Sequence, residues 1–102
     1  MSNSISKAFL TFNEKAPKHA AAWSEMIQKL SAANVLDTKT TSLIYLAVLA
    51  AQGMESGIPF HVQIAKQNGA GLDEIISAVL VGLPACGHKV TVVLPAIVDA
   101  FN

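Results

Sequence analysis

Residues 40–54 contain no charged side chain, and this run limits most strongly what the chain can fold into. Asp37 precedes the run as a suitable helix N-cap, and apolar residues fill most positions from there to about Gln52. A helix with so little polar surface has to be buried on all sides. The run is shorter than the ~20 residues that span a bilayer. It therefore predicts the central helix of a helical domain.

Helical periodicity continues along nearly the whole chain, without the alternating pattern and hairpin turns of a β protein. We predict an all-α fold, a bundle of about five to six helices. The expected helices cover residues 4–13, 17–32, 37–52, 59–68, 72–84 and 88–101. Pro84 and Pro95 are expected to end or kink the last two. With no evident linker, residues 1–102 are expected to form a single domain.

The composition favours a homo-oligomer. Hydrophobic residues make up 52% of the chain and charged residues 14%, which is apolar for a soluble monomer of this size. A central helix that is apolar all round also needs more packing partners than one short copy readily supplies. We therefore expect neighbouring subunits to cover part of it.

Charge and cysteine content argue against several classes of protein. Basic and acidic residues balance to a net charge of zero without a basic cluster, so we expect no binding to nucleic acid. The other long uncharged stretch, residues 75–88, is short and contains Gly82, Pro84 and Gly87, so we expect no membrane span. One cysteine and a polar N-terminus without a leader pattern favour the cytoplasm.

Five segments together resemble the carboxymuconolactone decarboxylase and alkyl hydroperoxidase D-like (AhpD-like) family. They are residues 36–44, 53–61, 68–70, 73–76 and 81–85, and the resemblance extends from about Trp23 to the end of the chain. It implies an AhpD-like helical bundle. It also implies assemblies built from dimers or trimers, with a dimer, a trimer or a hexamer as the expected states.

In peroxidatic members of that family, a glutamate, two cysteines and a histidine form the redox site. By the resemblance, the glutamate falls at Ser42, the cysteines at Met54 and Gly57, and the histidine at His61. A thioether does not ionise and glycine has no side chain, so a dithiol peroxidase cycle is not expected. The decarboxylase branch does without the cysteines but usually keeps the glutamate. The resemblance therefore implies the fold more strongly than the reaction.

His61 is the main candidate catalytic residue. It falls in the first turn of a helix opened by Pro59, where the helix dipole disfavours an imidazolium, and a neutral imidazole can act as a base. Glu55, in the preceding turn, is a second candidate that can orient His61. The alternatives are a packing histidine and a solvent-exposed carboxylate. Tyr45, Met54 and Phe60 are predicted to line a ligand pocket around His61.

Cys86 is the third candidate. Its position beside Gly87 and near His88 can make the thiol reactive and allow peroxide to oxidise it to a sulfenic acid. The alternative is a small packed residue, and a redox cycle would need an external thiol or another subunit. No short paired spacing of ligands appears, so we predict no metal and no cofactor. Ser42 reads as an ordinary buried serine that bonds the carbonyl four residues back.

Three functions remain open from the sequence. The first is a protein of this family without the dithiol that binds or transforms a small organic molecule around His61. The second is a non-catalytic oligomeric module for ligand binding or assembly. The third is reduction of peroxide by the single cysteine, Cys86.

Overall fold

The computed structural model describes residues 6–102, and every regular element in this range is a helix. Within this range there are seven α-helices and one 3-10 helix, and no strand. The predicted all-α fold is therefore confirmed. Contacts group the chain into two units, one ending at Leu36 and one formed by Asp37–Asn102.

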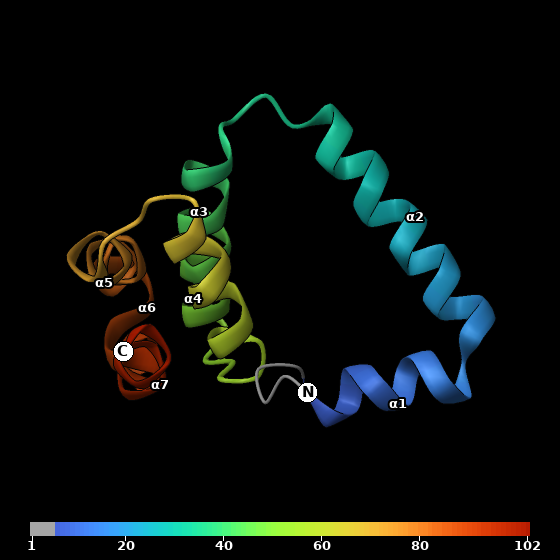
Figure 1. Ribbon diagram of the computed structural model, residues 1–102. Helices are drawn as coiled ribbons and strands as arrows, with labels where there is room; N and C mark the ends of the chain where they lie inside the picture. Colours follow the sequence, from blue (N-terminus) through green and yellow to red (C-terminus); the bar gives the residue numbers. More distant parts are fainter. Residues whose placement is uncertain (1–5) are drawn as a thin grey trace. The chain divides into compact units, whose positions relative to one another are not determined.

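The first unit consists of α1 (Lys7–Lys15) and α2 (Pro17–Ala33), which meet at Ala16 (Figure 1). The hydroxyl of Ser6 caps α1 by accepting a hydrogen bond from the backbone N–H of Phe9 at 3.1 Å. The predicted start of this helix, at residues 4 and 5, lies outside the described residues. Pro17 opens α2 and Asn34 ends it, as the sequence indicated.

This first unit buries little of its apolar surface. Ala20 is its one buried residue among those described. The rings of Phe12 and Trp23 join the two helices edge to face, with centroids 6.4 Å apart. The large apolar side chains of the unit that remain exposed are Phe9, Leu10, Trp23, Met26, Ile27, Leu30, Val35 and Leu36.

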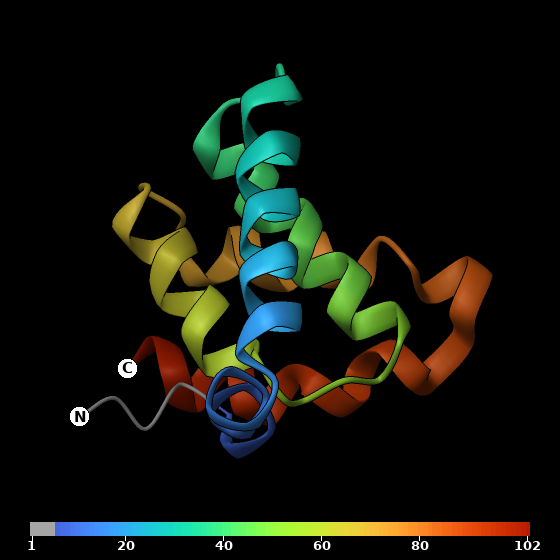
Figure 2. The same cartoon turned by 90° about the vertical axis from the view of Figure 1, so that its right-hand side faces the viewer.

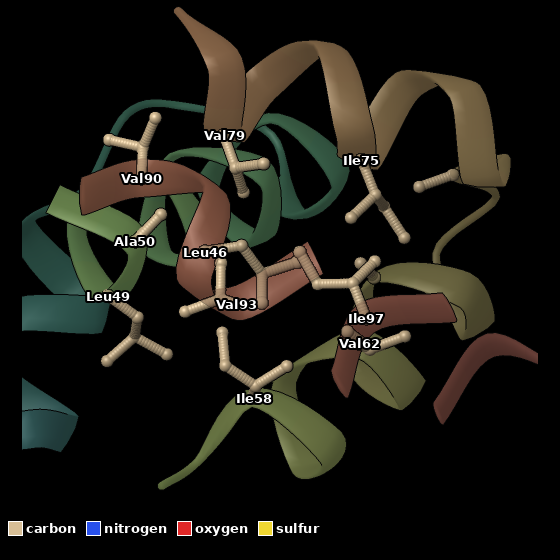
Figure 3. Packing of buried hydrophobic residues seen from close by; sticks show 12 residues of the cluster. Leu46, Leu49, Ala50, Ile58, Val62, Ile75, Val79, Val90, Val93 and Ile97 are labelled. Atoms are coloured by element: carbon tan, nitrogen blue, oxygen red, sulfur yellow. The ribbon is translucent and has the colours of Figure 1, made fainter. Parts of the chain in front are cut away.

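The second unit holds the hydrophobic core. It contains α3 (Thr38–Ala51), α4 (Ile58–Gln67), α5 (Leu72–Leu80), α6 (Leu83–Cys86), η1 (Gly87–Val93) and α7 (Leu94–Phe101). Helix α3 packs against α4, α5 and η1, and α4 packs against α7. Figure 3 shows apolar side chains from these elements converging, among them Leu46, Leu49, Ala50, Ile58, Val62, Ile75, Val79, Val90, Val93 and Ile97.

Polar contacts fix the ends of the helices around this core. Asp37 accepts a hydrogen bond from the N–H of Thr40 at 2.7 Å, which lowers the pKa of its carboxyl group. Glu74 accepts the N–H of Gly71 at 2.9 Å and pairs with Lys39 at 2.7 Å. The pair links the beginning of α3 to the beginning of α5, and these bonds lower the pKa of Glu74.

Helix α3 is not buried all round within this chain, because Ile44, Tyr45 and Val48 are exposed. The sequence predicts that one copy leaves part of this helix uncovered. Its predicted burial by neighbouring subunits stays a prediction.

The C-terminal region is divided into more helices than expected. Helix α5 ends at Leu80, and the expected helix of residues 88–101 is a 3-10 helix followed by α7. Gly87 turns the chain with φ +69°, and Pro95 has no N–H to donate back to Thr91.

Among the described residues, Leu83–Phe101 is long and apolar enough to cross a membrane by length and composition alone. In the structure this stretch is α6, η1 and α7 in succession, and Figure 2 shows the chain turning within it. It supplies Val90, Val93 and Ile97 to the core, all fully buried. Core packing therefore accounts for part of its apolar character, while Leu83, Val92 and Val98 are exposed.

Candidate functional site

The turn between α3 and α4 positions the predicted site residues. Gly53 and Gly57 both adopt positive φ angles, +66° and +89°, which favour glycine. Between them, the N–H of Met54 donates to the carbonyl of Leu49 at 2.9 Å. Gly57 is the N-cap of α4, and the N–H of His61 donates to its carbonyl at 3.0 Å. His61 therefore lies at the end of the first turn of α4, close to where the sequence placed it.

Three rings form an aromatic cluster around the candidate base: Tyr45, Phe60 and His61. The imidazole of His61 stacks on the ring of Tyr45, with centroids 4.1 Å apart and planes 26° from parallel. Phe60 meets the imidazole edge to face at 5.2 Å. Tyr45 comes from α3 and the other two rings from α4. The sequence predicted that Tyr45 and Phe60 lie near His61, and the structure brings the three rings together.

Burial lowers the pKa of His61 below its ordinary value of 6.5. Removing water around the imidazole disfavours the charged form more than the neutral one. The sequence also predicted a neutral His61, but from the helix dipole. In the structure, the cause of the lowered pKa is loss of water around the buried imidazole. At neutral pH the imidazole is therefore largely uncharged and can accept a proton.

Gly57 lies beside the imidazole, where the resemblance places a cysteine of the dithiol family. A Cβ atom at this position would lie 3.8 Å from Cδ2 of His61 and 3.9 Å from Cδ1 of Leu49. Both are ordinary contacts, so there is space for a small side chain. The obstacle is the backbone, because φ is +89° and other residues rarely adopt it.

The other candidates take no part in the ring contacts of the aromatic cluster. Glu55 is exposed, and among the described residues no hydrogen bond or ion pair joins its carboxylate to His61. Cys86 ends α6 and is exposed, so it is not the packed residue that was one of its two interpretations. Ser42 is buried, and its hydroxyl donates to the carbonyl of Thr38 at 2.9 Å, as predicted for an ordinary helical serine.

Lys89 is a neighbour of the turn that the sequence did not reveal. A Cβ atom on Gly53 would lie 3.2 Å from Cε of Lys89, so the lysine side chain extends across the backbone of this glycine. The two residues belong to distant parts of the chain, and no local motif connects them. Lys89 adds a positive charge beside the turn that carries Met54.

The cluster is an open surface. Tyr45, Met54 and Phe60 are 46%, 47% and 39% exposed. A groove of about 410 Å³ lies elsewhere, lined by Leu43, Asp73, Glu74, Ser77, Ala78 and Val81. This groove includes none of the residues predicted to line a pocket around His61. The pocket around His61 therefore stays a prediction. No group of three or more His, Cys, Asp or Glu side chains within the described range is arranged to hold a metal ion.

Comparison with known proteins identifies a family. Residues 17–99 match the family model described as "CMD: Carboxymuconolactone decarboxylase family". No curated protein and no solved structure matches the chain. The matched range covers α2 to most of α7, so it includes the whole aromatic cluster and crosses the boundary between the two units.

Proposed function

Because this chain belongs to the carboxymuconolactone decarboxylase family, we propose that it binds a small organic molecule at the aromatic cluster and transforms it by proton transfer at His61. The stacking of His61 on Tyr45 carries this proposal. It fixes the plane of a ring whose pKa burial lowers, and such an imidazole can take up a proton and readily give it to a bound ligand.

The aromatic surroundings favour a planar, partly apolar ligand. Tyr45 and Phe60 present accessible ring surface next to the imidazole, and Met54 adds an adaptable thioether within the preceding turn. The lactone after which the family is named has a flat unsaturated ring, and it also carries carboxylates. Lys89 provides a cation beside the same turn, which suits a carboxylate.

The proposed reaction is the loss of CO₂ from such an acid. The bond from carbon to its carboxylate breaks, CO₂ leaves, and the electron pair stays on the carbon until a proton reaches it. His61 takes up a proton from solvent and delivers it to that carbon, which balances the step. Because the pKa of His61 is lowered, its imidazolium gives up the proton readily.

The test is turnover of carboxymuconolactone, followed by NMR, for the unaltered protein, His61→Gln and His88→Gln. His88 is exposed and is not part of the aromatic cluster, so it is the matched control. The proposal expects turnover in the unaltered protein and in His88→Gln, and its loss in His61→Gln with an unchanged melting temperature. Equal turnover in both variants, or none in the unaltered protein, contradicts it.

A non-catalytic oligomeric module is the second candidate, and the exposed apolar surfaces favour it. Both units leave large apolar side chains uncovered, including those of α2 and the outer side of α3. If the protein is such a module, His61→Gln should leave ligand binding and the number of subunits unchanged. Neither the unaltered protein nor the variant should then show turnover.

Reduction of peroxide by Cys86 is a third candidate, supported by the exposure of its sulfur. The thiolate would attack one peroxide oxygen, the O–O bond would break to give sulfenic acid and water or alcohol, and an external thiol would reduce the sulfenic acid. Peroxide consumption with dithiothreitol, compared between the unaltered protein and Cys86→Ser, tests this reaction. Consumption that is equal in the two proteins contradicts it.

A further inference from the structure

Helix α4 ends at Asn68 and Gly69 in a turn that is both hydrogen-bonded and packed. Gly69 has φ +93°, and its N–H donates to the carbonyl of Lys66 at 3.0 Å. The N–H of Ala70 donates to the carbonyl of Ala65, also at 3.0 Å. These two bonds form a Schellman motif, in which a glycine in the left-handed region closes a helix. Ala65 and Ala70 are both buried in the core, so the motif is anchored there.

An asparagine that precedes a glycine is chemically labile, because the glycine has no side chain to obstruct attack on its neighbour. The backbone nitrogen of Gly69 attacks Cγ of Asn68. A bond forms between these two atoms, the bond from Cγ to Nδ2 breaks, and ammonia leaves with the proton of the attacking nitrogen. Water then opens the succinimide ring that remains, which gives aspartate or isoaspartate.

The folded backbone holds this reaction back. Asn68 has ψ +15°, which turns the nitrogen of Gly69 towards the backbone nitrogen of Asn68 and away from its Cβ. Ring closure needs the attacking nitrogen on the Cβ side, so ψ has to rotate far from this value. That rotation carries the peptide of Gly69 out of the Schellman motif and breaks both of its bonds. The side chain is held as well, since Nδ2 of Asn68 donates to the carbonyl of Ile64 at 2.8 Å.

We propose that Asn68 is a deamidation site whose rate is limited by local opening of the end of α4. A helix end of this kind opens without unfolding of the whole chain, so the reaction proceeds from a minor state of the folded protein. Every contact that restrains Asn68 lies within the unit Asp37–Asn102. The reaction needs only water, and it is independent of whether His61 is catalytic.

Deamidation removes part of what ends the helix. Nδ2 of Asn68 is a donor to the carbonyl of Ile64, whereas a carboxylate can only accept, and its charge lies at the negative end of the helix dipole. Isoaspartate also adds a carbon to the backbone, which shifts the register of the Schellman bonds. The same end of α4 holds α7, because Nζ of Lys66 donates to the carbonyl of Phe101 at 2.7 Å. The modified protein therefore has a weaker contact between α4 and α7.

The test compares the native protein with the same chain unfolded in urea, both in mildly alkaline buffer, which deprotonates the attacking nitrogen. Trypsin cleaves after lysine, so residues 67–89 form a peptide with Asn68 as its only asparagine, and mass spectrometry follows its conversion. Asn34 is the internal control. It also ends a helix, but the branched side chain of Val35 obstructs the attack. We expect rapid conversion of Asn68 in urea, conversion roughly tenfold or more slower in the native protein, and slow conversion of Asn34 in both.

Two variants at one exposed position test whether opening of the helix limits the rate. Gln67→Gly weakens the last turn of α4 and Gln67→Ala strengthens it, and both keep Asn68 and Gly69. In the native state the glycine variant is expected to convert about fivefold faster than the alanine variant, with equal rates in urea.

Three outcomes overturn the proposal. The first is equal conversion of Asn68 in the native and the unfolded chain. The second is an unfolded chain in which Asn68 reacts no faster than Asn34. The third is the same native rate in both Gln67 variants, with circular dichroism showing that each is folded.

Discussion

The imidazole of His61 lies against the ring of Tyr45, with centroids 4.1 Å apart. The residues that follow them, Leu46 and Val62, are both fully buried in the core between α3 and α4. One step along a helix turns a side chain by about 100°, so the buried neighbours hold the two rings at the edge of the same helix pair. The packing of the core therefore fixes the stacking at the candidate site.

Replacing Tyr45 by Ala should raise the pKa of His61 towards 6.5, because it admits water to one face of the imidazole. An NMR titration of the imidazole carbon protons measures this change. Ile44→Ala is the control, since Ile44 is exposed on the same helix and belongs to no ring contact of His61. An unchanged pKa in Tyr45→Ala would show that the ring does not shield the imidazole.

The stability of the protein should fall as the pH drops below about 6.5. The pKa of His61 is lower in the folded chain than in the unfolded chain, so the unfolded state binds more protons between the two values. The stability gained by keeping His61 neutral is full above the unfolded value and is lost as the pH falls through this window. Urea unfolding of the unaltered protein and of His61→Gln measures it, and equal pH dependence in the two would contradict the prediction.

Replacing Gly57 by Ala or Cys should destabilise the protein by about 1–2 kcal/mol, because φ is +89° at this position. Gly71→Ala is the matched control. Gly71 is also a helix N-cap but has φ −86°, and a Cβ atom there meets only Glu74 at an ordinary 3.8 Å. Chemical denaturation should give a clearly smaller loss of unfolding free energy for Gly71→Ala. Similar losses at the two positions would show that the positive φ of Gly57 is not the cause.

Replacing Leu46 by Ala should lower the free energy of unfolding by about 2–5 kcal/mol, since it opens a cavity in the centre of the core. Val48→Ala, two residues along α3, serves as the comparison because its side chain is more than half exposed. Its expected effect is within about 0.5 kcal/mol. A comparable loss in both variants would mean that the outer side of α3 is covered in solution.

The helices could be predicted from the sequence where local chemistry determines them. Asp37, Pro17 and Asn34 mark helix ends that the structure confirms, and the back-bonded hydroxyl of Ser42 was also predicted correctly. The C-terminal region was less predictable. The choice between an α-helix and a 3-10 helix at residues 87–93 depends on how Val90 and Val93 reach the core, which periodicity alone does not reveal.

At the candidate site, the resemblance pointed to His61, the sequence placed Tyr45 and Phe60 near it, and the structure supplied their geometry. The position of Lys89 over Gly53 depends on tertiary packing between segments far apart in the sequence, so no pattern indicated it. The proposed dyad of Glu55 and His61 rested on their closeness in sequence. Glu55 is exposed, and closeness in sequence does not determine where a carboxylate in a turn points, so the dyad stays a prediction.

The most direct test of proton transfer at His61 is the pH dependence of kcat/KM on carboxymuconolactone, measured for the unaltered protein and for Tyr45→Ala. Our account predicts an inflection at the pKa of His61 found by NMR, and an upward movement of both values together in the variant. An inflection that stays in place while the pKa of His61 moves would contradict the central role of this residue.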